Sequence, residues 1–478
     1  MAAHADGTLV GAAKSADRSA AVELLDAGTD ANARALDGTT ALHWAVYHDD
    51  FGLVERLVAA GADVEAANDF GATPMSEAAV IGNVEVLSLL LDAGARANAA
   101  NAEGQTPLMV VARTDNLDAA RLLLERGADV NAREQWKEQT ALMWAVAQSR
   151  PEMTRLLVGA GADVDARSKV HGWNRQVTAE PRAKHLPSGG FTPLLYAARQ
   201  GCLDCARALV EAGADVDRPD PDAVTPLLMA LLNAHFDTAK YLIEQGANVN
   251  KWDWWGRNPL YAAVDYNTLP RGGRPDRPSL DDMAPLEMIE LLLAHGANPN
   301  AQLKLLQPYR NLGADRGADS ILGIGTTALL RAAKAGDGPA IRLLLEHGAL
   351  PDLPQVNGIT ALMAAAGLRS SSIDTRGRLK TEEEAIASAR LLLDGGAAID
   401  ARDDSGQTAL HGAAFQGWNA LVRFLAERGA DLEARTDNGA TPIDAAMGRI
   451  RGGGRGAGEV NPHPDTAALL EALISSAN

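Results

Sequence analysis

Three of the eight tryptophans fall within four residues, beside charged side chains. The segment 251–257 supplies five candidate binding residues: Trp252, Asp253, Trp254, Trp255 and Arg257. Exposed tryptophans on a rigid loop dominate many binding hot spots, because each ring buries a large apolar area at small conformational cost. We therefore expect these residues to contact a partner. The alternative is that one or more rings pack against the edge of the fold, beneath residues 269–284.

A second set of side chains could support acid–base or ligand chemistry if the fold brought them together. Its members are His171, Arg175, His185, Asp253, Asp265, Tyr266 and Tyr309. Such groups can transfer protons once they converge in a closed cleft. No pair among them has the spacing of a catalytic motif, and no HExxH, GxSxG, Walker or GxGxxG pattern stands in a fitting context. An enzyme or small-molecule-binding protein is therefore the alternative hypothesis.

The two cysteines, Cys202 and Cys205, stand at the start of a predicted helix, where the helix dipole can lower a thiol pKa. Cys205 occupies an apolar position that Leu53 and Val86 hold elsewhere in the chain. We expect a buried structural cysteine, and neither a redox pair nor a metal ligand. Two cysteines also exclude a disulfide scaffold and a four-cysteine zinc site. We expect no metal and no cofactor.

The charge balance limits the classes of partner. Lys and Arg number 44 against 62 Asp and Glu, which gives a net charge of −18. Such an acidic chain is a poor binder of nucleic acid and anionic membranes, and it favours a partner of basic character. No apolar run approaches the roughly 18 residues that span a bilayer, so we expect a soluble chain without membrane insertion. The oligomeric state is not indicated.

The N-terminus bears on the compartment. Ala3, His4 and Ala5 have the small-x-small form of a signal-peptide cleavage site. We expect a mature exported, periplasmic protein that carries a remnant of that site. The alternative is an alanine-rich cytoplasmic start.

A repeated element must position these candidates. A four-residue pattern, called a tetrad below, recurs eleven times. It consists of Thr (once Asn), then Pro or Ala, then Leu, Ile or Met, and then a variable residue. The tetrads begin at Thr40, Thr73, Thr106, Thr140, Thr192, Thr225, Asn258, Thr327, Thr360, Thr408 and Thr441. Successive tetrads are 33 or 34 residues apart, except for steps of 52, 69 and 48. A period of 33 with the pattern T-P-L-H-x-A resembles the ankyrin repeat, here a bacterial-type, long array with inserted loops.

Local physical chemistry explains the residue types within one repeat. Thr73 suits the N-cap of a helix, and Pro74 suits its first position, where a missing N–H costs nothing. Gly82 ends this first helix and Gly94 ends the second, because only glycine adopts the left-handed conformation cheaply. A short extended stretch then leads into a β-hairpin loop, called a finger below. One repeat cannot bury its own apolar face, so stacking must supply the core.

The resemblance implies an all-α ankyrin-repeat solenoid of about twelve helix-turn-helix units with β-hairpin fingers and four long insertions. We predict one solenoid over residues 7–478. Its parts are an N-terminal capping repeat (7–35), repeats one to four (37–166), repeats five to seven (191–300), repeats eight to ten (326–436) and a C-terminal capping repeat (437–478). The irregular steps place two insertions in fingers, at 167–190 and 301–325, and two between helices, at 268–284 and 368–384. Long loops in a compact array are usually functional or disordered.

The resemblance also implies that the first helices line a concave face whose variable residue follows each tetrad. That position holds Trp44, Glu77, Val110, Trp144, Tyr196, Met229 and Ala262. Trp144 and Tyr196 precede the tryptophan segment in repeat order, and the lengthened fingers on either side contribute Trp173 and Tyr309. We predict that these residues form one aromatic partner-binding surface around repeats four to eight.

Two functions remain open from the sequence. The favoured one is a non-enzymatic scaffold that binds a partner protein or extended peptide on its concave, aromatic-rich face, since the ankyrin resemblance implies protein interaction. The alternative is an enzyme or small-molecule-binding protein whose pocket the inserted fingers close. The same family resemblance implies structural roles for His43 and His411, which hold the fourth tetrad position.

Overall fold

The computed structural model describes residues 8–171, 189–268, 281–305, 321–370, 380–450 and 462–477. They form two compact units, and each is described by itself. Unit 1 comprises 8–171 and 189–221, and unit 2 comprises the described residues from 222 onwards. Most of the four predicted insertions lies outside the described residues. One continuous solenoid of twelve repeats therefore stays a prediction.

The predicted tetrads begin helices. The first residue of each of the eleven tetrads is the N-cap of a helix. In α5 (Pro74–Ile81), the Thr73 hydroxyl accepts the backbone N–H of Ser76 at 3.2 Å, and the Ser76 hydroxyl accepts the N–H of Thr73 at 2.8 Å. These reciprocal bonds satisfy two donors that a helix start otherwise leaves unpaired. The tetrad is thus a helix-start signal repeated along the chain.

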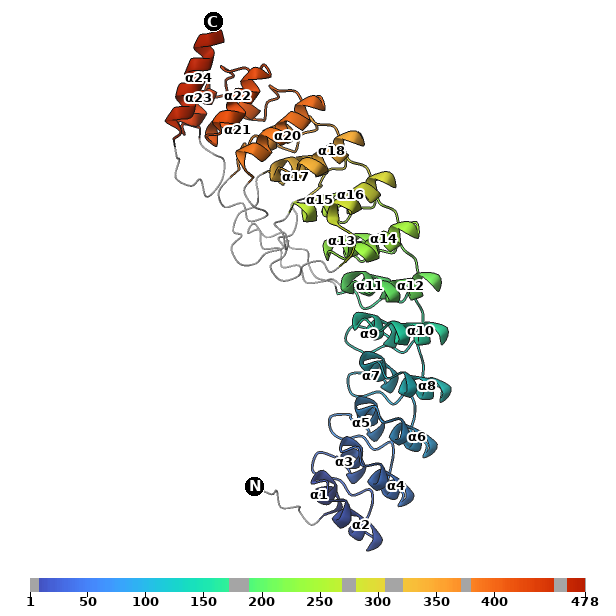
Figure 1. Cartoon of the computed structure of the whole chain (residues 1–478). Coiled ribbons are helices and arrows are strands. Elements are labelled where there is room, and N and C mark those ends of the chain that lie inside the picture. Colours follow the sequence, from blue (N-terminus) through green and yellow to red (C-terminus); the bar gives the residue numbers. More distant parts are fainter. Residues whose placement is uncertain are drawn as a thin grey trace. The chain divides into compact units, whose positions relative to one another are not determined.

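The helices of unit 1 form two layers (Figure 1). The first layer holds α1 (Leu9–Lys14), α3 (Ala41–Tyr47), α5 (Pro74–Ile81), α7 (Pro107–Thr114), α9 (Ala141–Ala147) and α11 (Pro193–Gln200). The second holds α2 (Arg18–Asp26), α4 (Phe51–Ala59), α6 (Val84–Asp92), α8 (Leu117–Glu125), α10 (Pro151–Gly159) and α12 (Leu203–Glu211). Each helix packs on its neighbour in the same layer and on its partner in the other.

Unit 2 repeats this arrangement (Figure 1). Its first layer holds α13 (Pro226–Leu232), α15 (Pro259–Asn267), α17 (Ala328–Ala335), α19 (Ala361–Ala365), α21 (Ala409–Phe415) and α23 (Pro442–Ala446). Its second layer holds α14 (Phe236–Glu244), α16 (Pro285–Ala294), α18 (Gly338–Glu346), α20 (Glu382–Asp394), α22 (Asn419–Glu427) and α24 (Pro464–Ala477). The all-α solenoid fold predicted from the repeats is confirmed.

Small and aliphatic residues fill the space between the layers. Ala78 and Ala79 of α5 are fully buried, as are Leu87 and Leu90 of α6. A methyl group at the first-helix position lets neighbouring helices approach closely, while the leucines of the second helix fill the remaining volume. The core therefore continues from one repeat into the next within each unit.

The fingers are tight turns and not the predicted β-hairpins. In the described residues no strand forms, and the only bridges are the isolated pairs Arg34 with Thr40 and Val170 with Gly189. A finger closes by two backbone bonds, such as those from Asn68 N–H to the Ala72 carbonyl at 3.0 Å and from Gly71 N–H to the Asn68 carbonyl at 2.9 Å, before the next helix begins. Its two arms are too short for a ladder.

Consecutive fingers are hydrogen-bonded through their tips. In unit 2 the N–H of Asp404 donates to the carbonyl of Asn357 at 3.0 Å. Gly358, at the turn of the earlier finger, has φ of +77°. A Cβ there would lie 2.9 Å from the Asp404 nitrogen, so two separate constraints select glycine at this position. Gly94, after α6, has φ of +96° but nothing within 4 Å of a Cβ.

These two glycines predict different costs of substitution. We expect Gly94→Ala to lower the free energy of unfolding by about 1 kcal/mol, because only its positive φ opposes a side chain. Gly358→Ala should cost about 1–3 kcal/mol more, because the next finger must also move. Urea midpoints at constant slope measure both. Equal losses would show that the neighbouring finger yields without cost.

The tetrad histidines join adjacent repeats, as predicted. His43 accepts the Thr40 N–H at its Nδ1 (3.2 Å) and reaches the Ala72 carbonyl in the next finger with Nε2 (3.0 Å). His411 makes the equivalent contacts with Thr408 and Ala440. Burial lowers the pKa of both histidines, although the bond to the next finger opposes the shift. Each ring is therefore held in its neutral form.

Stability should consequently fall on mild acidification. A histidine in the unfolded chain binds a proton near pH 6.5, whereas the folded chain resists protonation until a lower pH. The unfolded state binds more protons in that window, so the free energy of unfolding decreases as the pH falls from about 7 towards 5. His43→Gln with His411→Gln should be less stable at pH 7.5 but lose less between pH 7.5 and 5.5. Exposed His48→Gln is the control, and an unchanged pH slope in the double variant would contradict the assignment.

Candidate protein-binding surface

The tryptophan segment forms the finger between α14 and α15. The Asp253 N–H donates to the Arg257 carbonyl at 3.0 Å and closes the turn. On one side the Trp254 N–H donates to the Asp222 carbonyl at 2.9 Å, and on the other the Trp255 carbonyl accepts the N–H of Lys304 at 2.9 Å. Hydrogen bonds to both neighbouring fingers therefore fix the backbone of this finger.

A buried ion pair supports the finger from within. The Asp253 carboxylate accepts the backbone N–H groups of Trp255 (3.0 Å) and Arg257 (2.9 Å), and the Arg257 Nε lies 2.6 Å from it. Both side chains are almost fully enclosed. Burial raises the pKa of Asp253, while Arg257 and the backbone donors oppose that rise. Asp253 and Arg257 therefore shape the finger, which corrects their prediction as partner-contacting residues.

Of the three tryptophans in this finger, one is buried and two are exposed. Trp255 is only 9% exposed, and the Arg257 guanidinium lies 5.0 Å from its ring centroid. Trp255 is therefore buried, and its packing beneath residues 269–284 stays a prediction. Trp252 and Trp254 are 53% and 51% exposed. These two rings are available for contact with a partner.

A lysine of the next finger, Lys304, lies beside the exposed ring of Trp252. The Lys304 ammonium lies 3.8 Å from the ring centroid of Trp252, a close cation–π contact. Leu305, the next residue, is partly exposed, and its N–H donates to the Trp255 carbonyl at 3.1 Å. We call Trp252, Trp254, Lys304 and Leu305 the tryptophan surface. It combines apolar area with one positive charge.

Trp144 and Tyr196 lie in unit 1, whereas the tryptophan surface lies in unit 2, so their predicted joint surface stays a prediction. Trp144 is partly buried on α9, with the Arg113 guanidinium 5.5 Å from its ring centroid. Tyr196 is only 7% exposed, and its hydroxyl accepts the Gln139 amide at 2.6 Å. Tyr196 offers little surface to a partner.

Four residues that the sequence predicted for the binding or catalytic sites lie in the two lengthened fingers. Trp173, Arg175, His185 and Tyr309 lie outside the described residues. His171, which is described, is partly buried in the fifth finger of unit 1, between α10 and α11. The predicted contributions of the lengthened fingers therefore stay predictions.

The alternative catalytic residues in unit 2 serve the fold. The Asp265 carboxylate on α15 lies 2.7 Å from the Arg331 Nε on α17, and both side chains are buried. Tyr266 packs edge-to-face on Phe236, with ring centroids 5.2 Å apart. Asp253 is held by Arg257 within its own finger. Asp253, Asp265 and Tyr266 are thus engaged in separate structural contacts.

The described surface offers shallow depressions away from these residues. One of about 410 Å³ lies between α8 and α10 beside Arg121 and Leu156, and one of about 480 Å³ lies between α18 and α20 beside Arg342 and Ile386. Within the described ranges, no group of three or more His, Cys, Asp or Glu side chains could hold a metal ion. Of the helices described, none is long and apolar enough to cross a membrane.

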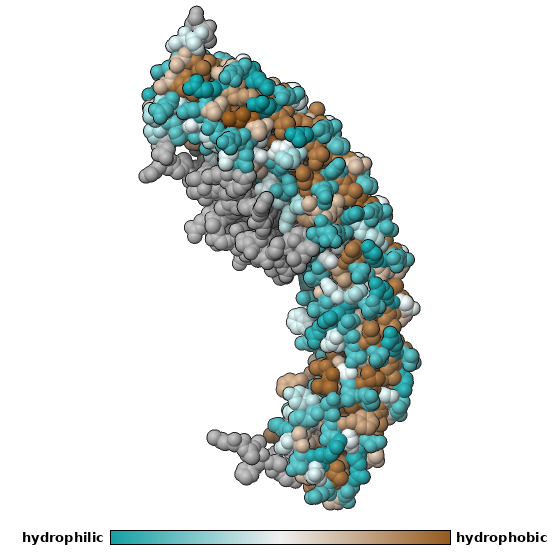
Figure 2. All heavy atoms as spheres, in the orientation of Figure 1, coloured by the Kyte–Doolittle hydropathy of each residue, from teal (hydrophilic) through white to brown (hydrophobic). Residues whose placement is uncertain are grey.

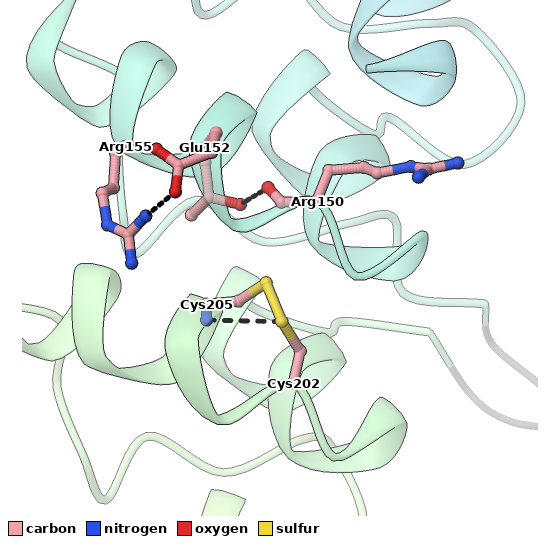
Figure 3. Close-up of a disulfide and its surroundings, with 6 residues drawn as sticks. Arg150, Glu152, Arg155, Cys202 and Cys205 are labelled. Atoms are coloured by element: carbon pink, nitrogen blue, oxygen red, sulfur yellow. Dashed lines mark hydrogen bonds and ion pairs between the residues drawn. A yellow bond between two sulfur atoms is a disulfide. The ribbon is translucent and has the colours of Figure 1, made fainter.

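Cys205 is fully buried, as predicted, but it forms a disulfide with Cys202 that was not expected (Figure 3). Cys202 is the N-cap of α12, and its sulfur accepts the Cys205 N–H at 3.3 Å. N-cap geometry therefore brings the two sulfurs together. Thr154 of the neighbouring α10 donates to the Arg150 carbonyl at 2.7 Å, while Arg155 pairs with Glu152 on the exposed side.

The sequence prediction missed a row of exposed apolar residues at the finger tips. Hydrophobic and hydrophilic residues are interspersed along each unit (Figure 2). Four of the most exposed apolar side chains stand just before a tetrad. Leu36, Trp136 and Val356 lie four residues before it, and Phe70 lies three residues before it. The register of the tetrads could have found Leu36, Trp136 and Val356, because Trp254 likewise lies four residues before its tetrad.

Removal of the Arg257 guanidinium should destabilise the finger between α14 and α15. We expect Arg257→Met to lower the free energy of unfolding by about 3 kcal/mol at pH 7, because it leaves the Asp253 charge buried without its partner. A carboxyl with a raised pKa binds its proton more readily when folded, so acidification towards pH 5 should recover part of the loss. Denaturant midpoints at both pH values test this. A loss that is independent of pH would contradict the assignment.

Comparisons with known proteins identify the repeat. "Ankyrin repeats (3 copies)" matches residues 9–101, 94–168 and 381–451, "Ankyrin repeats (many copies)" matches 194–243 and 227–274, and "Ankyrin repeat" matches 255–304. The mouse B-cell lymphoma 3 protein homolog is 28% identical over 180 residues, which span 38% of this chain and only 25% of the mouse protein. The human ASB11 ankyrin repeat domain is 21% identical with a TM-score of 0.41, covering 50% of this chain and 98% of that domain.

The bacterial-type assignment stays a prediction, because the curated relative named here is a mouse protein. The matched segments together cover more than half of the chain and coincide with the helix pairs of both units. On these grounds the chain belongs to the ankyrin-repeat family.

Proposed function

We propose that the chain is a non-enzymatic scaffold that binds a partner protein or an extended peptide through the tryptophan surface of unit 2. Ankyrin repeats are in general protein–protein interaction modules. The observation that carries the proposal is the exposure of Trp252 and Trp254 on a finger whose backbone is bonded to both neighbours. Rigid aromatic side chains lose little conformational freedom on binding, so most of their burial contributes to affinity.

The supporting residues strengthen this proposal. Asp253 and Arg257 fix the turn from inside, and Trp255 anchors it to the body of the unit. Lys304 holds one face of Trp252 and would remain close to the interface when a partner covers the other. A partner that offers a carboxylate or a backbone carbonyl beside an apolar residue would complement this arrangement.

Two carboxylates of the alternative catalytic set are engaged inside the fold. Asp253 and Asp265 each lie against an arginine inside the fold, so neither is presented as a proton acceptor. We therefore propose binding alone as the function of the described surface. We also retain export as a proposal, which the Cys202–Cys205 disulfide supports because such bonds persist mainly in oxidising compartments.

A double variant tests the proposed site. The full chain carrying Trp252→Ala and Trp254→Ala should bind a recovered partner at least about 30-fold more weakly, as expected for the loss of about 2 kcal/mol from anchoring rings. Leu350→Ala, an equally exposed apolar residue away from the finger tips, is the matched control and should keep wild-type affinity. Titration calorimetry and far-ultraviolet circular dichroism would measure binding and folding. Unchanged affinity in a folded double variant would refute the site.

A further inference from the structure

A second exposed row lies on the fingers of unit 1. Phe70 and Trp136 are 72% and 71% exposed, and Leu36 is fully exposed. All three stand at finger tips, where α3, α5 and α9 are about to begin. Leu36, Phe70 and Trp136 are called the unit 1 finger row below. Large apolar side chains thus stand exposed at three of the first four finger tips, and such exposure indicates a contact surface.

Bonds between the fingers hold this row in place. The Asp69 N–H donates to the Asp37 carbonyl at 2.9 Å, and the Gln135 N–H donates to the Glu103 carbonyl at 3.0 Å. Between these pairs, a Cβ on Gly71 would lie 2.9 Å from the Ala102 nitrogen. The first four fingers are therefore in contact, and their tips stand at intervals set by the stacking of the helices.

Carboxylates alternate with the apolar residues at the first three tips. Asp37 follows Leu36, Asp69 precedes Phe70, and Glu103 occupies the tip between Phe70 and Trp136. Backbone and side-chain hydrogen bonds from Thr39 lower the pKa of Asp37, so this group carries its charge at neutral pH. The fourth finger holds Lys137 and Glu138, of opposite sign.

The nearby cations are engaged with the protein itself. Lys14 lies 5.5 Å from the ring centroid of Trp44, and the Arg34 guanidinium donates to the Ala67 carbonyl at 3.2 Å. On the adjoining helix surface Glu77 of α5 is half-buried, and burial raises its pKa. Both cations keep their charge, and Lys14 helps to lower the pKa of Asp37. The first three finger tips themselves carry three carboxylates and no Lys or Arg, which favours a negative potential along them.

We propose that the unit 1 finger row binds an extended protein segment that carries about one basic and one large apolar residue in every three. Leu36, Phe70 and Trp136 would contact the apolar residues, and Asp37, Asp69 and Glu103 would pair with the basic ones. Charge complementarity selects this occupant, because an acidic or purely apolar segment would leave these carboxylates repelled or unpaired. This surface shares no residue with the tryptophan surface of unit 2.

The spacing fixes the length and register of the segment. Packed helices lie about 8–10 Å apart, so consecutive finger tips are separated by a similar distance. An extended chain advances about 3.3 Å per residue, so about three residues correspond to one repeat. Leu36 and Trp136 are three repeats apart, which corresponds to roughly nine residues. A helical segment would need about twice as many residues for the same span.

Designed peptides test the proposal without a known partner. Labelled (Lys-Leu-Ser)₄ has the proposed period, (Glu-Leu-Ser)₄ reverses its charge, and (Lys-Ser-Ser)₄ lacks its apolar residues. Fluorescence anisotropy with the full chain should give (Lys-Leu-Ser)₄ an affinity at least tenfold higher than either control peptide. Equal affinity for the peptides, or no binding of (Lys-Leu-Ser)₄ at low salt, would refute the proposal.

Variants of the chain locate the binding. Phe70→Ser with Trp136→Ser, and separately Asp37→Asn, Asp69→Asn and Glu103→Gln together, should each weaken (Lys-Leu-Ser)₄ binding at least tenfold. The triple variant should also reduce the salt dependence of the affinity. A matched triple variant, Glu55→Gln, Glu85→Gln and Glu125→Gln, changes the net charge equally on exposed sites of α4, α6 and α8. It should keep wild-type affinity, and an equal loss there would show general electrostatic attraction and refute a site on the fingers.

The unit 2 double variant separates the two proposals. Trp252→Ala with Trp254→Ala should leave the affinity for (Lys-Leu-Ser)₄ unchanged. A loss in that variant, with unit 1 variants unaffected, would place the peptide on the tryptophan surface and refute the assignment to unit 1. Circular dichroism confirms that each variant is folded.

Discussion

Each repeat leaves polar backbone groups that only the next repeat satisfies, and the other features depend on this constraint. Asn98 shows it directly, because its side chain donates to the Gly127 carbonyl at 3.0 Å and accepts the Asp129 N–H at 2.7 Å, both in the following repeat. His43 and the finger tips make further bonds of the same kind. An isolated helix pair would expose these groups together with its apolar face, so stability resides in the contacts between neighbours.

The same bonds explain why turns without a β-ladder can present side chains at defined positions. A finger tip is held by backbone bonds to both neighbours, and the Trp254 N–H and Trp255 carbonyl show both ends of this arrangement. The backbone is ordered before a partner arrives, so binding does not have to supply that entropy. Exposed tryptophans on such a finger can therefore bind more tightly than the same residues on a mobile loop.

Local signals predicted the fold well, whereas the candidate site depended on contacts that local patterns do not contain. Thr73 and Gly94 fell where expected because a helix start and a helix end each impose a requirement on one residue. Trp254 and Trp255 are adjacent and chemically identical, and only the position of the turn makes one exposed and the other buried. Asp253 and Arg257 likewise suit an exposed interface or a buried pair equally well from their types alone.

Net charge is a poor guide to each surface, because positive and negative side chains are distributed unevenly over the fingers. In unit 1, Lys14 lies over Trp44 and keeps its charge, whereas Asp37 and Asp69 stand at finger tips that carry no Lys or Arg. Lys304 lies over Trp252 in unit 2, where it places a positive charge inside the exposed aromatic surface. The two surfaces therefore share apolar character but differ in local sign. A basic partner would therefore favour the unit 1 finger row, and an acidic partner the tryptophan surface of unit 2. Repulsion would contribute to this choice as much as attraction, since a like charge that faces a desolvated group is costly.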